Sequence, residues 1–152
     1  MIHFYFPRYE DLWFRRQMLL DTATMAYNHA WGGTIDFPES KWKSWLDRWV
    51  AHPEDGRFYR YLRREDGEFV GEAAYYLEKG AWQTSLIVDA KHRGRGYGSE
   101  ALRLLCEAAK EQGITELYDE IALDNPSVPL FLRQGFVEEG RTREAVRLKK
   151  TL

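Results

Sequence analysis

A glycine-rich segment near residue 95 has the composition and spacing that most directly suggest chemistry. It follows the apolar run 86–88 and reads Arg93-Gly94-Arg95-Gly96-Tyr97-Gly98-Ser99. Alternating glycines let the backbone turn tightly with its N–H groups pointing inward, and a helix that begins there adds the positive end of its dipole. The two arginines add charge-assisted donors. The segment therefore predicts a cradle for a phosphate or a pyrophosphate.

Two familiar phosphate-binding patterns do not fit this spacing. The Walker pattern needs Gly-Lys-Ser/Thr at the end of its loop, and the dinucleotide pattern needs G-x-G-x-x-G, whereas the glycines here stand at positions 94, 96 and 98. An RNA-binding Arg-Gly segment is a third interpretation. It is disfavoured because the pattern occurs once and the formal net charge is -2.

Candidate acid–base residues lie on predicted strands. Glu72 and Glu120 are carboxylates within otherwise apolar runs, so each is a candidate general base. Each is equally explained as a sheet-edge residue paired with an arginine, and the sequence leaves both alternatives open. The single cysteine, Cys106, stands beside Leu105 in a predicted helix, where a small buried residue is the expected role.

An aromatic segment at residues 27–37 predicts an ordered loop, since solvated linkers seldom carry so many rings. It contains two adjacent glycines, and its candidate substrate contacts are Tyr27, His29, Trp31 and Asp36. A structural hydrogen bond explains His29 as well, and the same applies to His3, His52 and His92. The tryptophans at positions 42, 45 and 49 could form a cage for a cation, but their helical spacing favours core packing.

The elements that position these residues alternate between strand and helix periods. Strands are predicted at residues 2–6, 57–64, 68–78, 81–88 and 116–123, with one or two closing strands at 136–148. Helices are predicted at residues 9–20, 38–50, 99–112 and 126–134, and the buried face of the third should carry Ala101, Leu104, Leu105 and Ala108. A meander followed by alternating helices and strands predicts an α/β fold with a mixed sheet that can splay into a binding cleft.

Length and composition restrict the class of protein. The 152 residues suit one domain, 1–152, and no linker composition or repeat suggests a boundary. One cysteine and the absence of a secretion signal or apolar span favour a cytoplasmic protein without membrane contact. The charge balance disfavours nucleic acid as a partner, and no set of His, Asp and Glu has metal-ligand spacing, so no metal is expected.

The glycine segment resembles the R-x-x-G-x-G signature of the GCN5-related N-acetyltransferases, the GNAT family, through Arg93, Gly96 and Gly98. A second element is similar as well: Asn125 follows a predicted strand, and a short helix then ends in Gly135-Phe136. The resemblance implies a single GNAT-like fold of six to seven strands, splayed in the middle and flanked by about four helices. It also implies an acyl-CoA-dependent N-acyltransferase.

The resemblance assigns roles residue by residue. It implies that the backbones of Ile87 and Val88 bind the pantetheine arm of acetyl-CoA, and that residues 93–99 hold the pyrophosphate. Asn125 and Phe131 would flank the pantetheine and its thiol end. The aromatic loop at residues 27–37 would correspond to the family's segment that covers the acceptor. Acetyl transfer would proceed by direct attack of an amine of a small molecule or peptide, and since many members dimerise, a homodimer is a further expectation.

One departure from the family pattern concerns the mechanism. Many members have a tyrosine five residues before the phenylalanine of Gly-Phe, where it protonates the departing thiolate, but this sequence has Phe131. The segment from Asn125 to the short helix is also one residue shorter than the commonest pattern. A thiol with a pKa of about 8.5 is a tolerable leaving group without an acid. Phe131 also keeps open the alternative of a noncatalytic acyl-CoA-binding regulatory module.

Overall fold

Seven strands form one continuous sheet in the order β1-β2-β3-β4-β5-β7-β6. The structure is a computed structural model that describes residues 1–28 and 32–152 in full, together with the backbone of η2 (Ala26–Trp31). The strands are β1 (Ile2–Tyr5), β2 (Arg57–Arg64), β3 (Phe69–Glu78), β4 (Ala81–Val88), β5 (Glu116–Ala122), β6 (Val137–Arg141) and β7 (Ala145–Thr151). All neighbours are antiparallel except β4 and β5, which are parallel. The predicted α/β class with a mixed sheet is confirmed.

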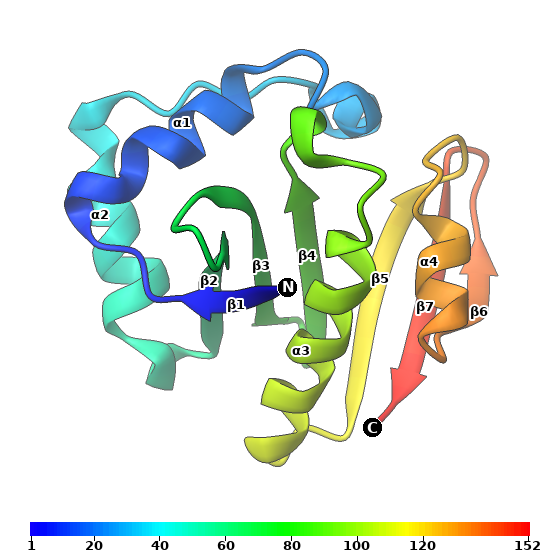
Figure 1. The fold of residues 1–152 in the computed structure, drawn as a ribbon. Helices are drawn as coiled ribbons and strands as arrows, with labels where there is room; N and C mark the ends of the chain where they lie inside the picture. The colour runs from blue at the N-terminus through cyan, green and yellow to red at the C-terminus, as the bar shows by residue number, and fades with distance from the viewer.

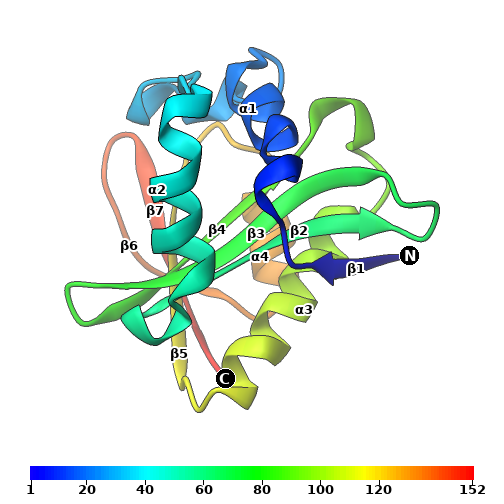
Figure 2. The same cartoon turned by 90° about the vertical axis from the view of Figure 1, so that its left-hand side faces the viewer.

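Helices cover both faces of this sheet (Figures 1 and 2). The helices α3 (Tyr97–Glu111) and α4 (Val128–Arg133) pack on one face, and α1 (Leu12–Leu20) and α2 (Trp42–Leu46) pack on the other. Each face therefore has its own hydrophobic cluster. Because successive strand residues point to opposite faces, the strands β1 to β4 contribute side chains to both clusters, whereas β5 and β7 contribute to the cluster under α3 and α4.

The predicted elements are confirmed in type, with differences at their ends. The helix predicted at 99–112 begins two residues earlier, at Tyr97, because Gly96 serves as its N-cap. Its buried face is rotated from the prediction: Leu102, Leu105, Cys106 and Ala109 are buried, whereas Leu104 and Ala108 are only partly covered. The error arises because α3 is covered by β3 and β4 on one side and by α4 on another.

The tryptophan-rich helix is irregular. It starts as the 3₁₀ turn η3 (Glu39–Lys41), continues as α2, and ends as the π-helical turn η4 (Asp47–Ala51). Trp42 and Trp45 are buried among other rings, which confirms core packing over a cation cage. Among the described residues, no helix has the length and apolar character needed to cross a membrane.

Candidate functional site

The candidate site lies where β4 and β5 diverge. Their ladder has a single pair, Gln83 with Tyr118, and the Thr84 Oγ1 donates to the Tyr118 carbonyl at 3.1 Å. Beyond this point a cavity of about 1000 Å³ opens between the strands, and we call it the central cavity. Ile87 and Val88 line it from β4. Their backbone on the β5 side has no ladder partner within the described part of the chain, so apart from the Val88 carbonyl, which accepts from Arg93, it is available to a ligand.

The glycine-rich turn forms one end of the central cavity. Gly96 has φ +82°, a conformation that favours glycine, and α3 begins immediately after it. Gly98 is needed for a different reason: a Cβ there would lie 3.0 Å from the Leu130 Cδ1, so glycine permits the close approach of α3 and α4. The first N–H groups of this 15-residue helix have no intrahelical partner, and they lie at the positive end of the helix dipole. The turn has the geometry of an anion site.

Arg93 does not act as the free side-chain donor that the sequence suggests. Its guanidinium donates to three carbonyls, those of Val88 at 3.0 Å, Thr24 at 2.7 Å and Ala23 at 3.3 Å. Its side chain therefore ties the end of β4 to the segment that follows α1. Arg95 is exposed and does not line the central cavity. The cradle is consequently built from backbone N–H groups and the helix end.

A second contact reinforces the tie made by Arg93. The Thr24 hydroxyl accepts a hydrogen bond from the Ala90 N–H at 3.0 Å and lies 3.3 Å from the buried Asp89 carboxylate. The same hydroxyl donates to Asp21, and this bond lowers the pKa of the Asp21 carboxyl. The loop after α1 and the glycine turn are thus one connected unit.

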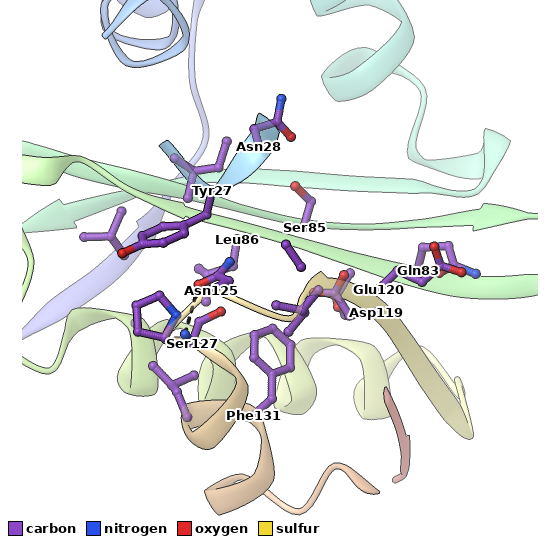
Figure 3. A pocket seen from close by; sticks show the side chains of 18 of the residues that line it. Tyr27, Asn28, Gln83, Ser85, Leu86, Asp119, Glu120, Asn125, Ser127 and Phe131 are labelled. Atoms are coloured by element: carbon purple, nitrogen blue, oxygen red, sulfur yellow. Dashed lines mark hydrogen bonds between the residues drawn. The ribbon is translucent and has the colours of Figure 1, made fainter. Parts of the chain in front are cut away.

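Asn125 and Phe131 lie on the α4 side of the central cavity (Figure 3). The Asn125 Oδ1 accepts from the Ser127 N–H at 2.9 Å, which starts the turn into α4. Phe131 is buried and packs edge-on against Phe136, with their ring centroids 5.0 Å apart. Phe131 has no polar atom, so it offers no proton at this position.

Glu72 is placed where it cannot reach the central cavity. Its carboxylate is 3.2 Å from the Arg15 guanidinium, and the pair is buried between β3 and α1. The guanidinium also lies 4.6 Å from the Trp45 ring centroid. Glu72 is absent from the cavity lining. This geometry argues against Glu72 as the base and supports the alternative of an arginine pair.

Glu120 lies at the cavity on β5. Its side chain is exposed, and one oxygen is 3.8 Å from the Arg147 guanidinium across the strand pair. It points to the face covered by α1 and α2, the face that η2 approaches. Of the two candidate bases predicted from the sequence, Glu120 is therefore the one that lines the central cavity.

Asp119, the residue beside Glu120 on β5, is a further candidate that was not predicted from the sequence. Asp119 is half-buried in the central cavity, and its burial raises the pKa of the carboxyl to about 8. The alternation of side chains along β5 indicates this position. Leu117 and Ile121, two residues before and two after Asp119, are core residues, so Asp119 points to the same face. A carboxylate in phase with core residues is a candidate for function.

The predicted acceptor residues are only partly brought together. Tyr27 lines the central cavity with 36% of its surface exposed, and the neighbouring Asn28 lines it too. Asp36 is exposed and does not line the cavity, so the structure does not support it as a substrate contact. The side chains of His29 and Trp31 lie outside the described residues.

Two other polar residues, His92 and Cys106, are buried and have contacts typical of structural residues. His92 is buried, with its Nε2 3.2 Å from the Glu68 carboxylate. Cys106 is buried in α3, and burial raises the pKa of its thiol, which makes it a poor nucleophile. In the described part of the chain, no group of three His, Cys, Asp or Glu side chains could hold a metal ion.

Comparison with known proteins identifies relatives by sequence model and by fold. A model of the acetyltransferase (GNAT) family matches residues 16–136. Comparison of the sequence with curated proteins gives no significant match.

Solved structures share the fold over the whole chain. Spermidine N-acetyltransferase from Vibrio cholerae, in complex with CoA and spermine, superposes with a TM-score of 0.81 at 17% identity, covering 99% of this chain and 95% of that one. Ribosomal-protein-alanine N-acetyltransferase from Brucella melitensis gives 0.75 at 24% identity, covering 100% and 99%. A GNAT-family acetyltransferase from Bacillus anthracis gives 0.79 at 15% identity, covering 99% and 94%.

Proposed function

Since this chain belongs to the GNAT family of acetyltransferases, we propose that it transfers the acetyl group of acetyl-CoA to a primary amine of a small molecule or peptide. The observation that carries the proposal is the divergence of β4 and β5 with the glycine turn at the end of the opening. In this proposal residues 1–152 act as one catalytic domain, supported by the continuity of the sheet.

The donor binds through the backbone. The pantetheine arm runs along the main chain of Ile87 and Val88, whose β5 side has no ladder partner, as a third strand would between β4 and β5. The Val88 carbonyl is not among its contacts, because it already accepts a hydrogen bond from Arg93. The N–H groups of residues 94–99 hold the pyrophosphate, with Ser99 adding its hydroxyl. Arg93 keeps the end of β4 and the turn in position, Arg95 adds positive charge near the phosphates, and Asn125 and Phe131 border the arm on the α4 side.

The amine attacks the thioester directly in a ternary complex. An alkylamine with a pKa of about 10.4 is largely protonated near neutral pH, so a base must remove a proton before or during attack. Glu120 has this role in the proposal, because it borders the central cavity on the face that η2 approaches. Its exposure allows the proton to pass to solvent.

The acceptor enters on the side of η2. Tyr27 and Asn28 there, with Tyr76 and Glu78 on β3, give an aromatic and acidic surround that suits a cationic amine. The structural neighbours named for spermidine and for a ribosomal-protein alanine support an amine acceptor, either small or peptidic.

One experiment tests the proposal. Thiol release from acetyl-CoA is followed against a panel of polyamines, amino acids and peptide N-termini, beside calorimetric titration of acetyl-CoA. Binding with thiol release in the presence of an amine is the expected result. Binding without release by any amine would favour the noncatalytic regulatory module that Phe131 suggests, and absence of binding would contradict both functions.

A further inference from the structure

The position that usually supplies a proton to the departing thiolate is apolar in this chain. Phe131 is 2% exposed and directs a hydrocarbon ring into the central cavity from α4. The ring extends toward the part of β5 that carries Asp119 and Glu120 (Figure 3). A proton donor for the thiolate therefore has to come from another element that reaches this side of the cavity.

Asp119 faces the same side of the sheet as Phe131. Its strand neighbours Leu117 and Ile121 belong to the cluster that contains Phe131, and so does Leu148, which pairs with Asp119 across β5 and β7. Glu120 points to the opposite face because side chains alternate along a strand. Consecutive carboxylates thus border one cavity from its two sides.

The surroundings of Asp119 favour its neutral form. It lies beside the β4–β5 junction, where Thr84 spans the two strands, and burial raises the pKa of its carboxyl to about 8. At neutral pH the group therefore carries a transferable proton. The charged or titratable side chains lining this end of the cavity are Glu120 on β5, Tyr76 and Glu78 on β3, Lys79 in the turn after β3, Arg147 on β7 and Arg133 on α4.

We propose that Asp119 is the general acid that protonates the CoA thiolate, in the place of the missing tyrosine; this rests on the proposed acetyl transfer. The amine nitrogen forms the C–N bond with the thioester carbon, the C–S bond breaks with its electron pair on sulfur, and the proton of Asp119 moves to that sulfur. The amine loses its proton to Glu120 or water. Asp119 regains a proton from solvent as products leave, so the net reaction yields amide and free CoA thiol.

The similar pKa values of the Asp119 carboxyl and of the leaving thiol support this assignment. A thiol of this kind has a pKa of about 8.5, close to that of the Asp119 carboxyl, and proton transfer between groups of similar pKa is efficient. The base on one face and the acid on the other are also kept apart, so neither neutralises the other before the amine and thioester meet.

The test is Asp119→Asn, which keeps the shape of the side chain but has no acidic proton. With acetyl-CoA we expect kcat to fall about 10²-fold, the lower end of the usual range for an acid catalyst, because a thiolate leaves tolerably by itself. With the acetyl selenoester analogue of CoA, whose selenolate leaves without protonation, wild type and variant should have similar kcat. The wild-type kcat should also decline as pH rises through about 8, and the variant should not show this decline.

Two further variants separate acid catalysis from a structural role. The double variant Asp119→Asn with Phe131→Tyr should recover kcat, because the tyrosine hydroxyl supplies the proton from α4. Glu120→Gln is the matched carboxylate control, and it should reduce kcat by a similar factor with both donors, since it acts on the amine. Melting temperature and acetyl-CoA affinity establish that each variant is folded and binds the donor.

The outcomes distinguish this inference from the proposed function. An active wild type whose Asp119→Asn variant loses the same factor with the thioester and the selenoester would overturn the acid role and leave the transferase intact. A wild type that releases no thiol with any amine would overturn both.

Discussion

The proposed donor half and the proposed acceptor half of this molecule are built in different ways. The donor half, from β4 to α4, presents backbone groups at a strand divergence and a glycine turn. The acceptor half, under α1 and α2, is a cluster of rings around the buried Arg15–Glu72 pair. Backbone sites need particular local conformations, which short motifs specify, whereas side-chain sites need several distant elements to meet. The first half could therefore be read as a motif and the second could not.

The largest effect is expected in the acceptor half. Replacing Arg15→Met leaves Glu72 buried without its partner, which should lower the free energy of unfolding by about 3–5 kcal/mol in urea titrations. The Arg15→Met, Glu72→Met double variant should recover most of this loss, because both charges are then absent. Additive losses from the two single changes would show that the pair is not coupled.

The next effect belongs to the donor half. Gly96→Trp should fill the phosphate cradle and weaken acetyl-CoA binding at least about 100-fold, or about 2.7 kcal/mol, by calorimetry. Gly113→Trp is the matched control, since Gly113 also has positive φ and open space but lies at the far end of α3. It should carry a similar backbone strain without changing the affinity. If both variants lost the same affinity for acetyl-CoA, the effect of Gly96→Trp would be due to backbone strain and not to filling of the cradle.

A smaller effect is expected at the boundary between the halves. A Cβ at Gly71 would lie 2.3 Å from the Ile87 carbonyl oxygen, so Gly71→Ala must displace β4 at the proposed pantetheine contact. We expect a loss of about 1–3 kcal/mol in stability together with weaker acetyl-CoA binding. Gly140→Ala, which meets no atom within 4 Å, should change neither. If Gly71→Ala bound acetyl-CoA with unchanged affinity, the segment of β4 beside Gly71 would not be part of the donor site.

The smallest effect concerns the proposed base. Glu120→Gln should reduce kcat about 10-fold near pH 6 and less at higher pH, where more of the amine is already deprotonated; the value lies below the usual range because water can replace an exposed carboxylate. Acetyl-CoA affinity should stay the same. Glu116→Gln is the control on the same strand, paired with Lys149 outside the central cavity. An identical pH–rate profile for wild type and Glu120→Gln would remove Glu120 from the mechanism.

Prediction from the sequence succeeded where neighbours along the chain decide the conformation. The bounds of β2 and β4 and the turn before α3 follow from local alternation and glycine spacing. It failed where partners are distant in the chain. Three features depend on which element packs against which face. They are the buried face of α3, the tie that Arg93 makes to the segment after α1, and the different surroundings of Asp119 and Glu120.

The sequence by itself determined the class of the fold, the glycine turn before α3 and the absence of a tyrosine at position 131, because these are properties of residue type and local backbone geometry. Only the tertiary structure decided which carboxylate is buried against an arginine, which one is exposed at the central cavity, and which one has its pKa raised by burial. Burial and electrostatic partners set the protonation of a carboxyl group, and both come from segments far apart in the chain.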